Sequence, residues 1–379
     1  MRLQLIALAV LLTPGAAAAD PEVTLSGDTL FYSDDDHVIV VSPQAAAKVA
    51  LDRDGSEAGV HAVIDVVSAA SVDVVSQATP GFTETRVELG AHGAHRIGRW
   101  LPGLALRWSE EPDYRSLGGR AGADVRLSGD TTASASYDAS IDTVGRTGTA
   151  YADWSASLQT HAGELGITQN LDRRTRVRAV ATVAVQDGYL EKPYRYVPLF
   201  DMAGVDRAAA DGVDLDLHSF DAYRLPERPP EQVPDRRLRA ALFARALRWL
   251  GRAGAGRADY RLYVDDWGMT AHTVELGLAV PLPAGVTVEL RQRAHLQTAV
   301  DFWQRVYVVD DAGTLPRYRT LDRELSGYLA STTSAGATWR HGAVVAYGEA
   351  GVMLTRFDDF LLLDRRLAVI AQLGARWSP

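Results

Sequence analysis

The chain has 379 residues and no cysteine, which excludes disulfides, thiolate metal sites and cysteine nucleophiles. Its 48 acidic and 39 basic side chains give a formal net charge of −9 at pH 7. An acidic balance argues against nucleic-acid binding and against attraction to anionic lipid. No segment beyond the N-terminal region has the run of about 18 apolar residues that a membrane-spanning helix needs.

The first 19 residues have the layout of a secretory signal peptide. Arg2 precedes an apolar run from Leu3 to Leu12, and a series of small residues ends at Ala19. The run is too short to cross a bilayer as a helix, and we place the cleavage after Ala19. The mature chain is therefore expected as an exported protein, either soluble or embedded in the outer membrane.

Alternation of polar and apolar residues, the pattern of β-strands, runs through the rest of the chain. Residues 20–57 could contribute one hairpin, through Val38 to Val41 and a turn at 52–55. One later segment, RRLRAALFARALRWL (236–250), also fits an amphipathic helix. The 14 predicted strands, each good to a few residues, are 58–68, 83–95, 103–110, 114–127, 132–142, 154–169, 175–188, 236–249, 257–266, 270–281, 286–298, 320–339, 343–356 and 362–377.

Two all-β folds produce such alternation, the soluble sandwich and the transmembrane barrel. Sandwich strands usually have about five or six residues, whereas most strands predicted here are long enough to cross a bilayer at a tilt. Their apolar face is thin and rich in Ala and Val, and their other face carries Arg beside Asp and Glu. The pattern favours a single antiparallel transmembrane β-barrel of about 14 strands, within a range of about 12 to 16.

Short and long connections alternate, as expected for periplasmic turns and outer loops. The longest, 191–235, holds ten acids, five bases and six prolines. A connection of this length is usually functional or disordered, so it is either a mobile, protease-sensitive outer loop or a lid over the barrel mouth. Asp211, Asp214 and Asp216 within it could bind calcium, but they lack the glycine and glutamate of an EF-hand loop.

Motifs for catalysis or cofactor binding are missing from the sequence. His92 and His95 are three residues apart, which places them on opposite faces of a strand. There is no G-x-S-x-G elbow and no phosphate-binding P-loop. An Asp–His–Ser set assembled across strands stays open. We therefore predict no catalytic residues, no metal site and no cofactor.

Charged residues on the polar faces form the best-defined constellation. With turns at 267–269 and 282–284, Glu275 is predicted to lie between Arg261 and Arg291 on three neighbouring strands. The set is interpreted either as a paired network that fills or stiffens the barrel, or as a selectivity lining. The members of this predicted lumen network are Asp124, Arg126, Asp259, Arg261, Asp265, Glu275, Arg291 and Arg293.

Four blocks combine strand alternation with aromatic and acidic positions: YRLYVDDWG followed by HTVELGL, DVVSAASVDVVSQATP with FTETRVE, GITQNLDRRTRVR with GYLEKPYRYV, and RQRAHLQTAVDFW. Together they resemble a bacterial family of predicted outer-membrane barrels that is classed as a domain of unknown function. The resemblance covers nearly all of the mature chain. It implies the barrel fold and the outer-membrane compartment, and it supplies no reaction and no catalytic residues.

The sequence thus predicts an outer-membrane barrel that contacts outer-membrane lipid, is inserted by the barrel assembly machinery and has no nucleic-acid partner. A periplasmic or lipoprotein partner is left open. The leading functional expectation is a channel or a transport or export barrel for a small hydrophilic or peptide-like solute. The alternatives are a membrane-embedded enzyme with a hydrolytic site at the loop rim, and a closed structural or docking barrel.

Overall fold

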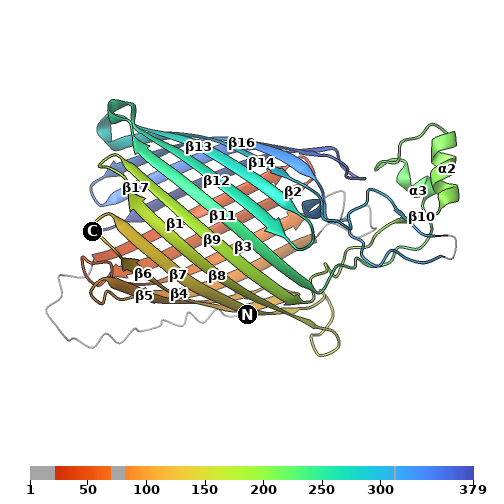
Figure 1. Cartoon of the computed structure of the whole chain (residues 1–379), viewed down its shortest axis with the longest axis horizontal. Helices are drawn as coiled ribbons and strands as arrows, with labels where there is room; N and C mark the ends of the chain where they lie inside the picture. The colour runs from red at the N-terminus through yellow and green to blue at the C-terminus, as the bar shows by residue number, and fades with distance from the viewer. Residues whose placement is uncertain (1–21, 70–81, 311–312) are drawn as a thin grey trace.

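The computed structural model describes residues 22–69, 82–310 and 313–379, so the predicted signal peptide lies outside the described residues. In the described part, sixteen strands close an antiparallel barrel (Figure 1). Each barrel strand pairs with the next one along the chain, and the first pairs with the last. No described helix is long and apolar enough to cross a membrane.

The barrel strands have 11 to 15 residues, which is sufficient for a tilted strand to cross the hydrocarbon core. Their bounds are β1 (Glu22–Asp34), β2 (Val38–Ala50), β3 (Glu57–Ala69), β4 (Phe82–Ala94), β5 (Trp100–Glu110), β6 (Tyr114–Arg126), β7 (Thr131–Val144), β8 (Ala156–Asn170), β9 (Thr175–Gly188), β11 (Arg236–Trp249), β12 (Ala255–Asp265), β13 (Thr270–Pro281), β14 (Val286–Gln297), β16 (Tyr328–His341), β17 (Val344–Phe357) and β18 (Arg365–Trp377).

The two strands beyond the predicted 14 come from the N-terminal segment. Here β1 and β2 form a hairpin, and β1 also pairs with β18 and closes the barrel. Within the described residues the barrel thus begins at Glu22, and the hairpin that the sequence left open within 20–57 is part of the barrel. Alternation is weak in this hairpin because the run from Ala45 to Ala47 offers no contrast between polar and apolar side chains.

The strand predicted at 320–339 starts too early, because β16 begins at Tyr328. Residues 320–327 instead contain a short 3-10 turn, η3 (Arg323–Leu325), with Leu325 buried beneath the outer loops. The segment at 236–249 forms the strand β11 and not a helix. A helix there would leave β9 and β12 with open edges inside the membrane, where unpaired backbone groups are very costly.

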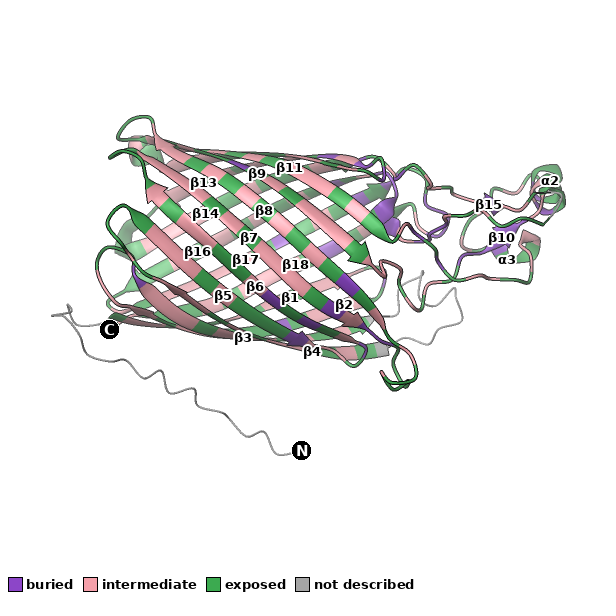
Figure 2. Ribbon diagram, turned by 60° about the horizontal axis from the view of Figure 1, so that its bottom comes forward, coloured by how far each residue is buried: buried purple, intermediate pink, exposed green. Residues whose placement is uncertain are grey.

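The two faces of the wall differ as a membrane barrel requires. Exposed and less exposed residues alternate along the strands (Figure 2). Large apolar side chains such as Leu104, Leu165 and Leu373 are about two-thirds exposed on the outside, where they form the lipid-facing band. The connections at one end are short, including η1 (Gly251–Ala253) and η2 (Pro283–Gly285), and this end is the periplasmic one by the usual rule for such barrels.

The long connections at the other end fold into a compact cap, which we define as residues 189–235, 298–327 and 358–364. It contains α2 (Met202–Ala210), α3 (Phe220–Tyr223) and a parallel pair of short strands, β10 (Leu199–Phe200) and β15 (Tyr307–Val308). Both helices and this pair stand beyond the end of the barrel (Figure 1). The cap core consists of Val197, Leu199, Phe200, Phe220, Tyr307, Leu321, Phe360, Leu361 and Leu362, together with Phe357 at the end of β17.

The acidic, proline-rich segment at 191–235 is folded, because several of its apolar residues belong to this core. The segment was predicted to be either a mobile loop or a lid, but it packs apolar side chains against two other connections. Burial of such side chains opposes local opening. Two of the aspartates considered for calcium have local roles: Asp216 accepts hydrogen bonds from the backbone of His218 and Ser219, and Asp211 accepts one from Tyr223.

Candidate functional site

All eight residues of the predicted lumen network lie at inward-facing positions of their strands. On the same strands, the alternate positions carry exposed apolar side chains such as Tyr260, Val264 and Leu276, which face away from the barrel. The eight are Asp124 and Arg126 on β6, Asp259, Arg261 and Asp265 on β12, Glu275 on β13, and Arg291 and Arg293 on β14.

The register between these strands is two residues away from the predicted one. Glu275 faces Asp259 on β12, while Arg261 faces Thr273. On the other side, Glu275 faces Arg293 on β14. A shift of two residues keeps each side chain on the same face, so the inward direction was predictable from alternation while the partner was not.

The predicted contact of Glu275 with two flanking arginines is therefore wrong. Glu275 forms its ion pair with Arg257, further along β12. Arg291 forms ion pairs with Glu349 on β17, across the intervening strand β16, and with Glu289 on its own strand at 3.5 Å. The long arginine side chains reach past the residues that face them in the register, and this reach decides which charges meet.

We call the inward-facing positions of β11 to β14 the basic wall. They carry seven arginines against four acids, a net of +3. Two further pairs on this wall are Arg237 with Asp265 at 2.5 Å and Arg245 with Asp259 at 2.6 Å. Four of the seven arginines thus have a carboxylate partner, as the paired-network interpretation expects.

The other three arginines of the basic wall are Arg239, Arg261 and Arg293. None of them has a carboxylate within 4.0 Å among the residues that the structure describes. The Nε atom of Arg239 is buried without a hydrogen-bond partner, and Arg261 lies 6.0 Å from the ring of Tyr263. The paired network is incomplete at these three positions.

The β6 members of the predicted network lie apart from the basic wall. Asp124 lines a cavity of about 290 Å³ together with Arg120, Glu164 and Arg178. The ion pairs there join Glu164 to Arg120 at 3.5 Å and to Arg178 at 3.9 Å. Asp124 and Arg126 form no ion pair with any described residue. The eight predicted residues are thus divided between two regions of the lumen.

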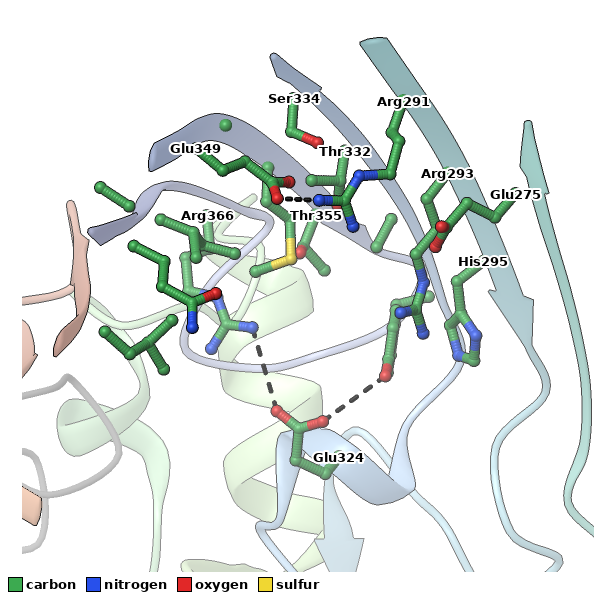
Figure 3. Close-up of a pocket in the computed structure, with 18 residues that line it drawn as sticks. Glu275, Arg291, Arg293, His295, Glu324, Thr332, Ser334, Glu349, Thr355 and Arg366 are labelled. Carbon is green, nitrogen blue, oxygen red and sulfur yellow. Dashed lines mark hydrogen bonds and ion pairs between the residues drawn. The ribbon is translucent and has the colours of Figure 1, made fainter. Parts of the chain in front are cut away.

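A cavity of about 500 Å³ lies against the inner wall near the cap (Figure 3). Glu324 of η3 reaches into it, 3.9 Å from Arg366 and 3.5 Å from the hydroxyl of Tyr328. Of the charged side chains that line this cavity in the described structure, Arg293 lacks a counter-ion. In Figure 3 its guanidinium lies beside Glu275 and His295 without a marked interaction.

The inward-facing positions of β1 to β4, which we call the acidic wall, carry the opposite charge. They hold seven acids against two bases, a net of −5. In the strand order, three strands separate the two walls on one side and five on the other, so they face each other across the lumen. The acids are Glu22, Asp28, Asp34, Glu57, Asp65, Glu84 and Glu88.

At the outer rim of the acidic wall, the carboxylates of Glu84, Glu111 and Asp113 come within 4.8 Å of one another. The hydroxyl of Tyr194, in the cap, donates to Asp113 at 2.6 Å. Burial raises the pKa of Glu111, although the nearby positive charge of Arg86 opposes the shift. This cluster was not predicted, because Glu84 lies far along the chain from the other two acids. The acid-rich run at 110–113 is the signal that the sequence offers.

A second charged cluster, which we call the cap ion cluster, lies inside the cap. Arg195 binds Asp322 at 2.6 Å and Glu231 at 3.4 Å. Glu231 also accepts hydrogen bonds from the backbone nitrogen of Lys192 and from the hydroxyl of Thr320. The side chain of Glu231 is only 2% exposed, so this cluster joins two of the loops that build the cap.

We expect the cap to become less stable as the pH rises above about 4.5. Burial raises the pKa of Glu231 above its ordinary value of about 4.5, so the folded cap binds a proton that the unfolded loop releases. Stability is lost as the pH rises through the folded pKa. For Asp322, burial acts to raise the pKa but Arg195 outweighs it, and the pKa is lowered below 3.8. Asp322 therefore favours the folded cap above its unfolded pKa and removes stability only in stronger acid.

The measurement is the rate at which a protease cuts within 191–235, at pH 5 and at pH 8, in the wild type and in Glu231→Gln. Comparing the two proteins at each pH cancels the protease's own pH dependence. The wild-type rate, divided by the variant rate, should rise from pH 5 to pH 8. A constant ratio would show that Glu231 does not titrate with cap opening.

One Ser–His hydrogen bond bears on the hydrolytic alternative. Ser56 Oγ lies 3.2 Å from Nδ1 of His95. Ser56 is fully buried and its Oγ also accepts from the backbone nitrogen of Arg96, in turns at the periplasmic end and not at the loop rim. Within the described residues, no carboxylate forms an ion pair with His95, whereas His92 lies inward, 3.8 Å from Glu57.

Among solved structures, the chain is similar to a bacterial polysaccharide outer membrane secretin, with 8% identity over 94% of this chain and 97% of that one and a TM-score of 0.47. The siderophore receptor PirA from Acinetobacter baumannii has 9% identity over 90% of this chain and 54% of that one, with a TM-score of 0.45. The outer membrane protein OprD from Pseudomonas aeruginosa has 8% identity over 95% of this chain and 94% of that one, with a TM-score of 0.42. The chain thus spans about half the length of PirA.

A comparison with curated proteins finds no match. A family model described as "Protein of unknown function (DUF3570)" matches residues 42–342. This range includes the YRLYVDDWG hairpin and all the other blocks on which the family resemblance rests. The match extends over most of the length of the chain, and the protein therefore belongs to the DUF3570 family of proteins of unknown function.

Proposed function

We propose that the protein provides an aqueous pathway across the outer membrane for small hydrophilic solutes. The observation that carries this proposal is a closed barrel of sixteen strands with charged residues on its inner face. Barrels of about 16 strands are wide enough to leave an aqueous channel, whereas barrels of about eight are filled by their own side chains. Inward-facing residues also contribute to the lining of cavities of about 500, 290 and 460 Å³, of which the last two share Arg120.

The position of the cap supports the same proposal. Both α-helices of the described chain stand beyond the end of the barrel, and neither fills its interior (Figure 1). The element that approaches the lumen is η3, whose Glu324 lines the cavity near the mouth. A cap that stands over the mouth can limit which solutes enter without closing the barrel itself. A peptide-like solute or an export role would be compatible with this arrangement.

Single-channel recording in planar lipid bilayers tests the proposal. We expect stepwise increases of current in KCl when purified, folded protein is added, because an aqueous lumen conducts ions. Folding is checked separately by the change of migration in detergent gels on boiling, which a closed barrel shows since it has no free edges. Folded protein that inserts into liposomes but gives no current would contradict the proposal and favour a closed structural or docking barrel.

A further inference from the structure

The basic wall has an excess of positive charge that ion pairing does not account for. Its four paired arginines are matched by the four carboxylates of the same wall, with Glu289 lying 3.5 Å from Arg291, and Arg291 is also bound by Glu349 of β17. The net charge of +3 therefore resides in Arg239, Arg261 and Arg293. Uncompensated charges inside a protein are costly unless a partner or water solvates them. Three such arginines on one wall therefore suggest a negatively charged partner that enters the lumen.

The carboxylates that face these arginines in the register are already occupied. Arg239 faces Asp265, whose carboxylate is held by Arg237. Arg239 therefore lacks a counter-ion even though a carboxylate lies opposite it, because that carboxylate is bound by Arg237.

The same holds on β14. Arg293 faces Glu275, and Glu275 is bound by Arg257. Between the two ends of the row, Arg261 faces the hydroxyl side chain of Thr273, which carries no charge. All three guanidinium groups therefore keep hydrogen-bond donors that no described carboxylate takes up.

The three arginines lie on neighbouring strands of the basic wall. Arg261 faces Thr273 on β13, and Thr273 faces His295 on β14, so Arg261 stands level with a residue two positions from Arg293. Arg239 and Arg261 lie on adjacent strands, and β13 alone separates Arg261 from Arg293. The three form a row across the outer part of the basic wall, with Arg293 at the cavity near the cap.

We propose that this row is a binding track for the oxyanion groups of small solutes, the carboxylates or phosphates that an arginine fork recognises. The guanidinium group offers several donors in a planar arrangement that matches such groups. An anion that moves along the row exchanges one guanidinium for the next and leaves the paired arginines undisturbed. The acidic wall, with its net of −5 across the lumen, keeps the anion on the side of the row.

This inference rests on the proposed channel and names its substrate class. The test is the reversal potential in a KCl gradient, together with block of the chloride current by citrate and, in a separate arm, by inorganic phosphate. We expect the wild type to prefer chloride over potassium. Arg261→Gln should reduce this preference and weaken citrate block by about tenfold or more, and the triple variant with Arg239→Gln and Arg293→Gln should abolish the preference.

Arg245→Gln is the matched control, because it removes the same charge from the same wall but from a paired arginine. Its partner Asp259 keeps a second arginine, Arg257, at 3.7 Å. The proposal requires a clearly smaller effect for this variant than for Arg261→Gln. Equal effects would mean that net charge alone sets selectivity, and that the row is no binding track. Boiling-dependent migration in gels shows whether each variant has folded.

A readout without current separates this inference from the proposed channel. Citrate and phosphate binding to folded protein in detergent is measured by titration calorimetry, for the wild type, Arg261→Gln and Arg245→Gln. Current without anion preference or block overturns the track and leaves the channel standing. Binding that depends on Arg261 but occurs without any current overturns the channel and leaves the track standing. Phosphate binding without citrate binding would assign the track to phosphate-bearing solutes.

Discussion

Replacing Asp265 with alanine is expected to destabilise the barrel by about 3–5 kcal/mol, because it leaves a buried arginine without its counter-ion. The Asp265 side chain is fully buried, and Arg237 donates to its carboxylate from Nε at 2.9 Å and from Nη2 at 2.5 Å. The same carboxylate accepts the hydroxyl of Tyr263 at 2.8 Å and the backbone nitrogens of Trp267 and Met269 at 3.1 and 2.9 Å.

These contacts explain why the YRLYVDDWG segment is built as it is. Asp265 closes the β12–β13 turn, and the turn buries Trp267 and Met269 beneath the cap together with Val233 and Leu325. Gly268 has a φ of +86°, and a Cβ atom there would collide with the Asp301 carboxylate. The motif is thus an anchor between barrel and cap, and the loss of Asp265 weakens both sides of it.

Asp266→Ala is the matched control for this prediction. The neighbouring carboxylate is exposed and accepts a hydrogen bond from the backbone nitrogen of Leu238 at 2.8 Å. Its loss should cost about 0.5–1.5 kcal/mol. The measurement is the urea concentration at which the compact band is lost in detergent gels. Similar midpoints for the two variants would refute the central role given to Asp265.

Alternation predicted the barrel and the direction of each charged side chain, because a period of two is set by the pleat of the strand itself. It could not predict the partner of Glu275. In the structure Val264 pairs with Thr270, whereas the expected turn paired residue 266 with residue 270. The carboxylate of Asp265 accepts the backbone nitrogens of Trp267 and Met269, so the turn begins earlier than expected and the register shifts by two positions. A shift of this kind leaves every side chain on its own face, so the sequence pattern carries no trace of it.

The cap was out of reach for a different reason. Its core combines Val197 and Phe220 with Tyr307 and Phe360, which come from three connections separated by complete strands. Within any one connection these apolar residues have neither the strand nor the helix period, and prolines interrupt them. Only the closed barrel brings the three connections together, so local composition suggested a mobile loop where tertiary packing produces a folded one.

Replacing Arg195 with alanine is expected to open the cap while leaving the barrel closed. Arg195 is the shared partner of Glu231 and Asp322, and its removal leaves two carboxylates near each other in a region that excludes water. Breaking a buried pair in this way costs about 3–5 kcal/mol. If opening and closing are fast relative to cleavage, the rate of proteolysis within 191–235 should rise by about 100-fold or more.

Two further variants make the expectation for Arg195→Ala specific. Arg207→Ala removes the same charge from an exposed position on α2 and should change the cleavage rate little, since exposed charges contribute little to stability. Adding Glu231→Gln to Arg195→Ala removes one of the two opposed carboxylates and should restore much of the protection. If the double variant is cut as fast as Arg195→Ala, then lost packing of the arginine, and not carboxylate repulsion, opens the cap. Boiling-dependent migration should persist in all three proteins, because the sixteen-strand barrel closes through its own backbone pairing.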